Sequence, residues 1–331
     1  MEKRNIVMAI AIVILITIAF IISKNYSKQN SYEVQTEDVK FLKIDAGNIK
    51  TETNEQVLLK GISSHGLQWY SDLLTENALK YLRKEFDINT FRIAIYVNKD
   101  LNLESIKEKL YPIVDNLIEL DLYVIIDWHT LEEGDPNVYT EEAINFFSEV
   151  SRKYADIPNV LYEICNEPNG NPVTWDNHIK PYAEKIIPVI RENSSKSIII
   201  VGTPDYCKKV NKPADNPLNY ENIVYSAHFY AGKHGKDLKD NIEYALQKGI
   251  AVLVTEWGTT DESGTGKIYE ELSKEWIEFL NKRNIGYINW SFCNKNEGSA
   301  ILSEKYTNKE EKVIHKYLTD SGKLVREIYN K

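Results

Sequence analysis

The stretch DLYVIIDWH, residues 121–129, shows the pattern that decides the fold. Its apolar residues run from Leu122 to Ile126 without interruption, and polar side chains follow at once. Such a run is typical of a parallel strand, because helices cover both faces of a parallel sheet and leave neither face to water. We therefore predict a buried parallel strand at residues 121–127.

Seven further runs of this kind recur at intervals of roughly thirty residues, which leaves room for one helix between successive strands. Two intervals, 104–120 and 141–154, repeat apolar residues at helical spacing, and we expect Pro112 to break or restart the first helix. Eight strand–helix units predict a single (β/α)8 barrel. A doubly wound open sheet is the competing fold, but no G-x-G-x-x-G or P-loop motif follows a strand. The seven runs are 57–62 (VLLKGI), 89–95 (NTFRIAI), 160–165 (VLYEIC), 197–202 (SIIIVG), 223–228 (IVYSAH), 250–255 (IAVLVT) and 286–291 (GYINWS).

Three segments before the barrel have patterns of their own. Residues 1–24 have a basic start followed by an apolar run at 6–22, which is the pattern of an export signal. Residues 25–40 are polar and predict a tether. Residues 41–56 alternate around an Ala-Gly-Asn sequence and predict a β-hairpin that would cover the N-terminal end of the barrel.

The apolar run at 6–22 is longer than the usual core of a signal peptide and short for a spanning helix. A cleaved signal peptide and an uncleaved signal-anchor helix therefore both remain open. The positive charge precedes the run, which keeps the N-terminus in the cytoplasm and directs the rest of the chain outward. We expect an extracellular protein, secreted or anchored to the outer face of the plasma membrane, that contacts the membrane only through residues 6–22.

The composition narrows the range of partners. The chain has 331 residues with 40 basic and 49 acidic side chains, and its net charge of −9 argues against nucleic acid or an anionic membrane surface as a partner. The three cysteines, Cys165, Cys207 and Cys293, show no C-x-x-C spacing, so we expect neither a metal site nor a cofactor. Aromatic residues form 11% of the chain, and flat aromatic faces suit uncharged ligands such as sugars. We expect a monomer.

Polar and aromatic residues gather where the predicted strands end. In a (β/α)8 barrel the chemistry lies at the C-terminal ends of the strands. A single polar residue there is readily explained as structural, but seven of the eight predicted strand ends carry such residues, which predicts a functional site. They are Ser64-His65-Gly66 with Trp69, Arg92 with Tyr96, Asp127-Trp128-His129, Asn166-Glu167-Pro168, His228-Phe229-Tyr230, Glu256-Trp257-Gly258 and Trp290.

Two of these residues, Glu167 and Glu256, follow different strands and would face one cleft. Strand alternation places Glu256 on the same face as Val252 and Val254, which we interpret as the face toward the barrel interior. Two converging carboxyl groups are what glycosidic cleavage requires, one as acid and one as base or nucleophile. The alternative is that each glutamate closes an ion pair at the barrel end. The preceding Asn166 favours the first interpretation, because its amide could bind a sugar hydroxyl.

Six blocks of sequence carry a family resemblance: GISSHGLQWY (61–70), IDWH (126–129), YEICNEPNG (162–170), HFYAG (228–232), TEWG (255–258) and INWS (288–291). In this order they resemble glycoside hydrolase family 5, and in particular its bacterial endo-β-1,4-glucanases, the cellulases. The Asn-Glu-Pro sequence alone is shared by a wider group of barrel glycosidases, so the six blocks together carry the resemblance. It implies a catalytic domain over residues 41–331.

The resemblance implies a retaining hydrolase that cleaves internal β-1,4-glucosidic bonds of cellulose-type β-glucans by double displacement. Glu167 would be the general acid/base and Glu256 the nucleophile. Arg92 would hydrogen-bond Glu256 and keep it ionised, Tyr230 would contact the same carboxylate, and His228 would support Glu167. The other implied substrate-binding residues are Asn166 and His129 at the cleavage site, Trp290, Trp69, Tyr96 and His65 on the non-reducing side, Lys295 and Glu297 further out, and Trp175 and His234 toward the leaving group.

A retaining mechanism sets conditions on the two carboxyl groups. They should lie about 5–5.5 Å apart rather than ~6.5–9.5 Å, with the acid protonated and the nucleophile ionised. We expect Arg92 to lower the pKa of Glu256, and nearby negative charge to raise the pKa of Glu167.

Two other functions remain open. The first is a related β-glycanase that acts on lichenan, xyloglucan or mannan, because residues at strand ends do not select among these polysaccharides. The second, from a different class, is a surface carbohydrate-binding protein built on an inactive barrel. The presence of both Glu167 and Glu256 argues against the second function.

Overall fold

The computed structural model of the protein describes residues 39–155 and 157–331. The predicted export segment at 1–24 and most of the predicted tether at 25–40 lie outside the described residues. Within the described ranges, no helix is both long enough and apolar enough to cross a bilayer.

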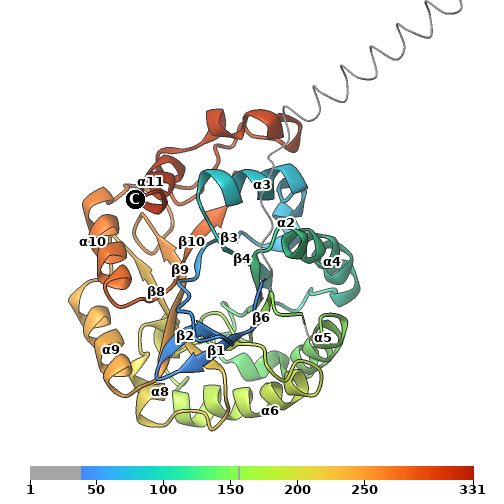
Figure 1. The fold of residues 1–331 in the computed structure, drawn as a ribbon, viewed down its shortest axis with the longest axis vertical. Helices are drawn as coiled ribbons and strands as arrows, with labels where there is room; N and C mark the ends of the chain where they lie inside the picture. The colour runs from blue at the N-terminus through green and yellow to red at the C-terminus, as the bar shows by residue number, and fades with distance from the viewer. Residues whose placement is uncertain (1–38, 156) are drawn as a thin grey trace, which may run out of the picture. The chain divides into compact units, whose positions relative to one another are not determined.

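Eight parallel strands close into a barrel in the order β10-β3-β4-β5-β6-β7-β8-β9 (Figure 1). Each predicted apolar run overlaps one of these strands, with the ends displaced by a few residues, and the (β/α)8 prediction is confirmed. The strands are β3 (Lys60–Ser64), β4 (Thr90–Tyr96), β5 (Tyr123–His129), β6 (Val160–Glu163), β7 (Ile199–Val201), β8 (Ile223–Tyr230), β9 (Ala251–Gly258) and β10 (Tyr287–Phe292).

Helices surround the barrel and cover the outer faces of its strands (Figure 1). Helix α5 is an example: it buries Phe146, Phe147 and Val150 on one side, as helical periodicity requires. The α-helices are α2 (Leu67–Tyr70), α3 (Glu76–Glu85), α4 (Leu103–Glu119), α5 (Thr140–Lys153), α6 (Lys180–Arg191), α7 (Pro204–Cys207), α8 (Asn211–Asp215), α9 (Lys236–Gln247), α10 (Glu270–Asn281) and α11 (Asp320–Tyr329), with 3-10 turns η1 (Ser71–Leu73), η2 (Pro136–Tyr139) and η4 (Asn308–Tyr317) and a π-turn η3 (Trp175–Ile179).

Helix α4 continues through Pro112, contrary to the predicted break. Proline removes one backbone donor and leaves the carbonyl of Glu108 without its helical partner. Both residues are exposed, whereas Ile113 and Val114 are buried. The missing hydrogen bond therefore lies on the solvent side, where water serves the carbonyl and the packing of the buried face holds the helix together.

The interior of the barrel is filled by aliphatic side chains from strands on opposite sides. Ile125 of β5, Leu161 of β6, Ile200 of β7 and Leu253 of β9 belong to one buried cluster, and each is at most 1% exposed. Strands on opposite sides of a closed barrel can contact one another only through its centre. These side chains therefore form a packed core beneath the open end of the barrel.

A short antiparallel hairpin, β1 (Leu42–Asp45) and β2 (Asn48–Thr51), lies against the N-terminal ends of the strands. Its Leu42 and Ile49 join the interior cluster. The backbone N–H of Ile44 donates to Asn222 Oδ1 at 3.0 Å, just before β8. The hairpin adds apolar contacts and a hydrogen bond at the end of the barrel that is opposite the predicted site.

Strand β9 contains a β-bulge before its C-terminal end. Ser226 of β8 pairs with Leu253, but His228, two residues later, pairs with Glu256, three residues later. The pairing of β9 with β10 shifts in the same region. One extra residue in a strand reverses the alternation of its side chains beyond that point.

Glu256 faces the barrel interior as expected, but it does so because of the bulge and not because of regular alternation. Ala251 and Leu253 belong to the interior cluster, so Val252 and Val254 point toward the surrounding helices. Alternation from the two valines would have placed Glu256 outside. The bulge turns it inward instead, next to its neighbour Thr255.

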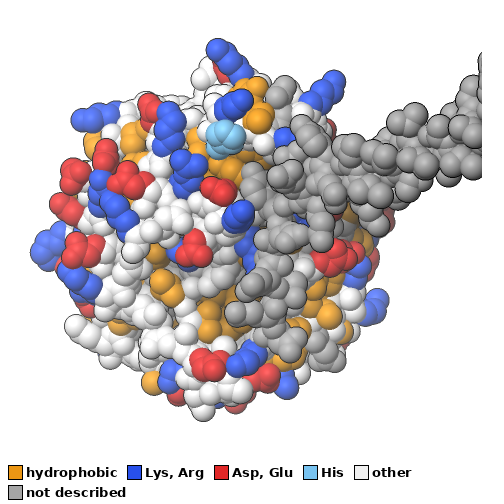
Figure 2. Space-filling view, turned by 45° about the horizontal axis from the view of Figure 1, so that its top comes forward, with side chains coloured by type: hydrophobic (Ala, Val, Ile, Leu, Met, Phe, Trp, Pro, Cys, Tyr) orange, Lys and Arg blue, Asp and Glu red, His pale blue; other side chains and the backbone are white. Residues whose placement is uncertain are grey.

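Charged side chains are interspersed over the face of the molecule in Figure 2, where basic and acidic groups alternate rather than forming large patches of one sign. Many are paired one helical turn apart, such as Lys236 with Asp240 at 2.6 Å and Lys282 with Glu278 at 2.5 Å. Exposed pairs of this kind contribute little to stability. The stability of the fold therefore depends on its core.

Leu253→Ala tests the contribution of the interior cluster. Leu253 is fully buried, and we expect its truncation to lower the free energy of unfolding by about 3 kcal/mol, because the surrounding strands cannot collapse around the cavity. Leu272→Ala is the matched control, since Leu272 is 42% exposed on α10 and should change stability by less than about 0.5 kcal/mol. Urea denaturation measures both; equal losses would contradict the assignment of Leu253 to the core.

Candidate active site

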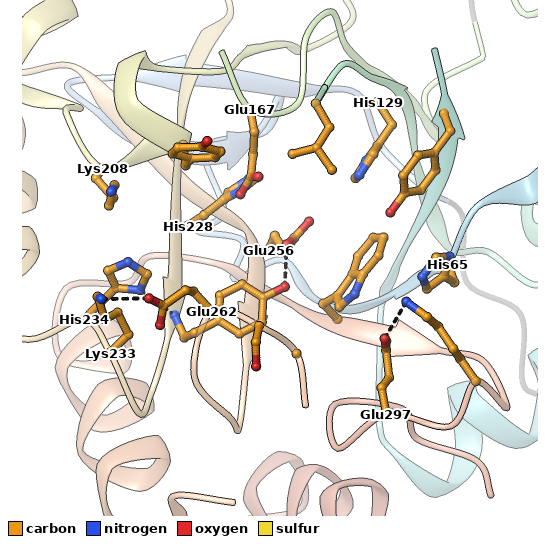
Figure 3. Close-up of a pocket in the computed structure, with 18 residues that line it drawn as sticks. His65, His129, Glu167, Lys208, His228, Lys233, His234, Glu256, Glu262 and Glu297 are labelled. Atoms are coloured by element: carbon orange, nitrogen blue, oxygen red, sulfur yellow. Dashed lines mark hydrogen bonds and ion pairs between the residues drawn. The ribbon is translucent and has the colours of Figure 1, made fainter. Parts of the chain in front are cut away.

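A cavity of about 560 Å³ opens at the C-terminal ends of the barrel strands. In Figure 3, Glu167 and Glu256 lie near its middle, with Lys208, Lys233 and His234 at one end and His65 and Glu297 at the other. The residues expected from the sequence that line it are His65, Tyr96, His129, Glu167, His228, Tyr230, His234, Glu256, Trp290, Lys295 and Glu297.

Arg92 and Asn166 do not line the cavity but lie directly beneath it, fully buried. The Arg92 guanidinium donates to Glu163 Oε2 at 2.7 Å and to Asn166 Oδ1 at 2.6 Å. It also pairs with Asp127 at 3.0 Å and with Glu256 at 3.4 Å. Burial lowers the pKa of Arg92, but these three carboxylates raise it above its usual value, so the group stays charged.

The contact with Arg92 also orients Asn166 and, through it, His129. Because a guanidinium only donates, the atom of Asn166 that faces it must be the amide oxygen. The amide nitrogen then donates to His129 Nε2 at 3.3 Å. His129 consequently carries its proton on Nδ1 and donates it to Asp127 at 2.6 Å. Burial lowers the pKa of His129 well below its usual value, so its ring is neutral.

The Glu256 carboxylate is held from two sides. The hydroxyl of Tyr230 donates to Glu256 Oε1 at 2.7 Å, and Arg92 approaches Oε2. Gly258 makes room for the Tyr230 ring, because a Cβ atom there would lie 2.4 Å from two ring carbons. Glu256 itself is 5% exposed, so its position is fixed and little of it meets solvent.

Glu167 is held by His228 on the other side of the cavity. Its Oε1 lies 2.8 Å from His228 Nδ1, and the second ring nitrogen of His228 lies 2.9 Å from Thr255 Oγ1. Thr255 in turn donates to Glu163 Oε1 at 2.6 Å. A continuous chain of hydrogen bonds thus connects Glu167 with Glu163 below the cavity.

The two carboxyl groups in the cavity lie close together. A carboxylate oxygen of Glu167 and one of Glu256 lie within 4.8 Å of each other, with His228 within the same distance of both. This approach of the two oxygens is closer than the ~6.5–9.5 Å between carboxyl groups that leaves room for a water between them. It is close to the about 5–5.5 Å typical of a carboxyl pair that forms a covalent intermediate.

The same three residues form the one group among the described residues whose side chains are close enough to share a metal ion. Both ring nitrogens of His228 already make hydrogen bonds, one to Glu167 and one to Thr255. A metal would have to break one of them. We therefore assign no metal site to this group.

The pKa values of both glutamates are raised, whereas we expected the pKa of Glu167 to rise and that of Glu256 to fall. Burial raises the pKa of Glu167 to about 7, while Arg92 and Lys208 lower it; the nearby negative charge that we expected is not the cause. Burial also raises the pKa of Glu256, as does Glu167, and together they outweigh His228 and Arg92. Arg92 does lower the pKa of Glu256 as expected, but the net shift is upward rather than downward.

One wall of the cavity is formed by aromatic rings. The ring of His65 stacks on Tyr96 with centroids 5.6 Å apart, and His129 stacks on Trp290 at 5.3 Å. Trp69 lies at the edge of this group, 5.1 Å from Tyr96, and is 58% exposed. An exposed indole beside a polar cleft offers an open face for stacking.

Of two further predicted site residues, Lys295 lines the cavity and Trp175 does not. Lys295 pairs with Glu297 at 2.6 Å on the cavity wall. Trp175, in contrast, is 2% exposed and donates to the carbonyl of Asn216 at 2.8 Å. It borders a neighbouring cavity, which shares Tyr206 with the first one, so the structure does not bring Trp175 together with the other predicted residues.

Sequence reasoning missed two kinds of residue. Glu163 and Thr255 are buried beneath the cavity, and a signal for Glu163 existed: a buried acidic residue in an apolar strand needs a cationic partner, and Arg92 is one. The other missed residues had no signal, because their positions depend on the course of the segments that follow the strands. They are Leu131, Tyr206 of α7, Lys208, Lys233, Glu262, Ser263 and Gly264.

A (β/α)8 barrel with two facing carboxyl groups, one after β6 and one within β9, has the arrangement of a barrel glycoside hydrolase. The sequence matches the family model described as "Cellulase (glycosyl hydrolase family 5)" over residues 50–296. The chain therefore belongs to glycosyl hydrolase family 5.

Individual relatives agree with this assignment. The chain is 48% identical to endoglucanase A of Evansella cellulosilytica over 250 residues. The aligned region covers 75% of this chain and 51% of that protein. The chain is 40% identical over 329 residues to endoglucanase N of Pectobacterium atrosepticum, covering 99% and 73%. The catalytic domain of Thermobifida fusca endoglucanase Cel5A matches with a TM-score of 0.83 at 32% identity, over 88% of this chain and 98% of that one. The chain spans about half the length of the Evansella relative.

Arg92→Met tests whether one cation holds the buried carboxylates. Removing it leaves Asp127, Glu163 and Glu256 without their counter-ion, and we expect stability to fall by about 3–5 kcal/mol at pH 7. Arg92 lowers the pKa values of all three carboxyls, so without it their folded-state pKa values rise further above their unfolded values. The loss should therefore be smallest near pH 4, where the folded parent and the folded variant both keep these protons. It should grow as the pH rises and only the folded parent, with its lower pKa values, releases them.

Thermal and urea unfolding at pH 4 and pH 7 measure this dependence. Arg152→Met, on the exposed side of α5, is the matched control and should be neutral at both pH values. A loss for Arg92→Met that is the same at both pH values would show that Arg92 contributes packing rather than charge.

Proposed function

We propose that this protein hydrolyses internal β-1,4-glucosidic bonds of cellulose-type β-glucans with retention of configuration. The observation that carries the proposal is the approach of a Glu167 carboxylate oxygen to within 4.8 Å of a Glu256 carboxylate oxygen in one cleft. Relatives named endoglucanase, and a T. fusca Cel5A variant solved in complex with cellotetraose, support the choice of substrate.

We assign Glu167 as the general acid/base and Glu256 as the nucleophile. Burial raises the pKa of Glu167 to about 7, which suits a group that first donates a proton and later accepts one. Glu256 is supported as nucleophile by two donors, Tyr230 and Arg92, that stabilise its charge. Once Glu256 becomes a glycosyl ester it loses that charge, and Glu167 then serves as base toward water.

The other residues of the cleft are proposed to bind sugars. Trp290, Trp69, Tyr96 and His65 supply ring faces that match the flat faces of glucose, and they lie together on one wall. The remaining proposed contacts to sugar hydroxyls come from His129, Lys295, Glu297 and His234. Asn166, which lies beneath the cavity, is proposed to act there through His129, which it orients. Trp175, which borders the neighbouring cavity, is not included.

Two alternatives carry less support. A lichenase, xyloglucanase or mannanase would use the same pair of glutamates, but the family model described as cellulase and a relative named cellulase favour cellulose-type glucans. A non-catalytic carbohydrate-binding protein would not need two buried carboxyls so close together, because their mutual repulsion is unfavourable without a chemical role.

The cellular location and the domain organisation are also part of the proposal. The basic and apolar pattern of residues 1–24 supports export, either as a secreted protein or as one anchored outside the plasma membrane, with the barrel of residues 41–331 as the catalytic domain. We propose that the barrel acts as a monomer on β-glucan.

Product analysis tests the function directly. With purified residues 36–331 on cellulose-type glucan, lichenan, xyloglucan, mannan and xylan, we expect oligosaccharides from the first substrate at the highest rate. Proton NMR should detect the β-anomer first, because two inversions at the anomeric carbon restore its configuration. First release of the α-anomer would exclude the retaining mechanism, and preference for another polysaccharide would favour the corresponding alternative.

Single amide substitutions test the two roles. Glu167→Gln and Glu256→Gln should each lower kcat by several orders of magnitude and still bind cello-oligosaccharides, because the amide keeps the shape of the carboxyl but cannot donate or attack. Glu271→Gln, at an exposed position in the first turn of α10, is the control and should keep full activity. Initial rates and calorimetric binding constants measure these effects; hydrolysis that survives in both site variants would refute the mechanism.

A further inference from the structure

The hydrogen bonds below the cavity have a direction that follows from the groups involved. Glu167, His228, Thr255 and Glu163 form an unbroken chain that ends at Arg92, with donor–acceptor distances of 2.8, 2.9, 2.6 and 2.7 Å. Three of its side chains, those of His228, Thr255 and Glu163, are at most 2% exposed. Water therefore has little access to the chain, and the protons must be distributed among its own members.

The positions of the protons can be assigned from Arg92 onward, because its guanidinium can only donate. Its Nε–H donates to Glu163 Oε2, and the Thr255 hydroxyl donates to Glu163 Oε1. Burial raises the pKa of Glu163 and Arg92 opposes that rise. The geometry decides the state of the group: two donors, one of them charged, contact its two oxygens and hold Glu163 in the form that accepts at both. Thr255 has a single hydroxyl proton, and Glu163 receives it.

The oxygen of Thr255 is therefore free only to accept. His228 Nε2 lies 2.9 Å from it and must carry a proton to make that hydrogen bond. Ser226, 2.5 Å from the same oxygen, must likewise be a donor. Thr255 thus selects the Nε2–H tautomer of His228.

The other nitrogen of His228 faces Glu167. Burial lowers the pKa of His228 to about 4, so the ring is neutral above that pH and its Nδ1 has a lone pair. Glu167 Oε1 lies 2.8 Å away, and two acceptors cannot form a hydrogen bond. The bond forms when Glu167 carries the proton.

We propose that Thr255 and Glu163 are positioning residues that fix the tautomer of His228 and thereby hold the proton on Glu167 before the reaction. This inference rests on the proposed function for its chemical meaning, since a general acid must be protonated when substrate binds.

The same arrangement favours the second step of the reaction. When the O–H bond of Glu167 breaks and its proton passes to the glycosidic oxygen, the carboxylate is left facing the lone pair of His228 Nδ1. It regains a proton by taking one from water, whose oxygen attacks the anomeric carbon while the ester bond to Glu256 breaks. The repulsion makes Glu167 a stronger base at the moment when a base is needed.

Other charged and titratable groups also face Glu167 and His228, and substitution of Thr255 leaves them in place. Any change in the titration of Glu167 in such a variant therefore follows from the lost hydroxyl. These groups are Arg92 and Tyr96 on β4, Asp127 and His129 on β5, Cys207 and Lys208 at the end of α7, Tyr230 on β8 with His234 after it, and Glu256 on β9.

The first experiment compares Thr255→Val with Thr255→Ser. Valine has the shape of threonine but no hydroxyl, so His228 is free to move its proton to Nδ1 and donate it to an ionised Glu167. We expect the alkaline limb of kcat/KM, near pH 7 in the parent protein, to fall by about one pH unit or more in Thr255→Val. Thr255→Ser should restore the parent profile. An unchanged limb in Thr255→Val, or one shifted equally in both variants, would overturn the proposal.

The second experiment needs no activity and so separates this proposal from the proposed function. ¹⁵N NMR of the imidazole ring at pH 7 should show the proton of His228 on Nε2 in the parent protein and in Thr255→Ser, and on Nδ1 in Thr255→Val. A parent His228 protonated on Nδ1 would refute the proposal even in a fully active enzyme. The expected tautomer in a protein without hydrolase activity would support it and refute the proposed function instead.

Glu163→Gln provides an independent variant if Thr255→Val does not fold. The amide oxygen of the new residue must face the Arg92 donor, which leaves its NH₂ group toward Thr255. Thr255 is then free to donate its proton either to His228 Nε2 or to Ser226 Oγ, so Ser226→Ala is combined with Glu163→Gln to leave His228 as the acceptor. NMR should show the ring proton on Nδ1 in this double variant; a ring that keeps its proton on Nε2 there would contradict the directed chain.

Discussion

The arrangement of the site depends on the burial of one cation, Arg92, among three carboxylates from other strands. Asp127, Glu163 and Glu256 lie on β5, β6 and β9, and a single guanidinium on β4 contacts all three. One positive charge cannot balance three negative charges in a medium of low polarity. Burial therefore raises the pKa of Asp127 to about 7 even though Arg92 lowers it. The barrel mouth retains protons at a pH where exposed carboxyls have lost them.

Arg92 also sets the direction of hydrogen bonds on both sides of the cleft, because it only donates. Through Asn166 it places the proton of His129 on Nδ1. Through Glu163 and Thr255 it places the proton of His228 on Nε2. Two histidines beside one cleft thus have opposite tautomers, and each follows from the same residue. Neither histidine needs to be charged for this order to persist.

The sequence predicts the parts of this structure that depend on regular patterns. Continuous apolar runs predict the eight strands, and polar residues at their ends predict most of the cavity lining. The sequence does not predict the burial of Trp175. The indole N–H of this residue donates to the backbone carbonyl of Asn216, a contact that has no sequence pattern. Nor does the sequence predict the continuous helix through Pro112, because tertiary packing outweighs the local preference. Regular strand alternation counted back from Glu256 predicts the wrong face for Val252 and Val254, because no sequence pattern marks the bulge in β9.

The bulge in β9 also changes how many neighbouring side chains of one strand can face the site. A regular strand offers every second side chain to the interior, so neighbouring residues cannot both serve a site there. The extra residue in β9 lets Thr255 and Glu256 face inward in succession, one toward His228 and the other toward Tyr230. Deleting a residue from this segment would restore the regular register and remove one of the two from the barrel. A change in the length of this strand would therefore displace several side chains at once, whereas a substitution changes one.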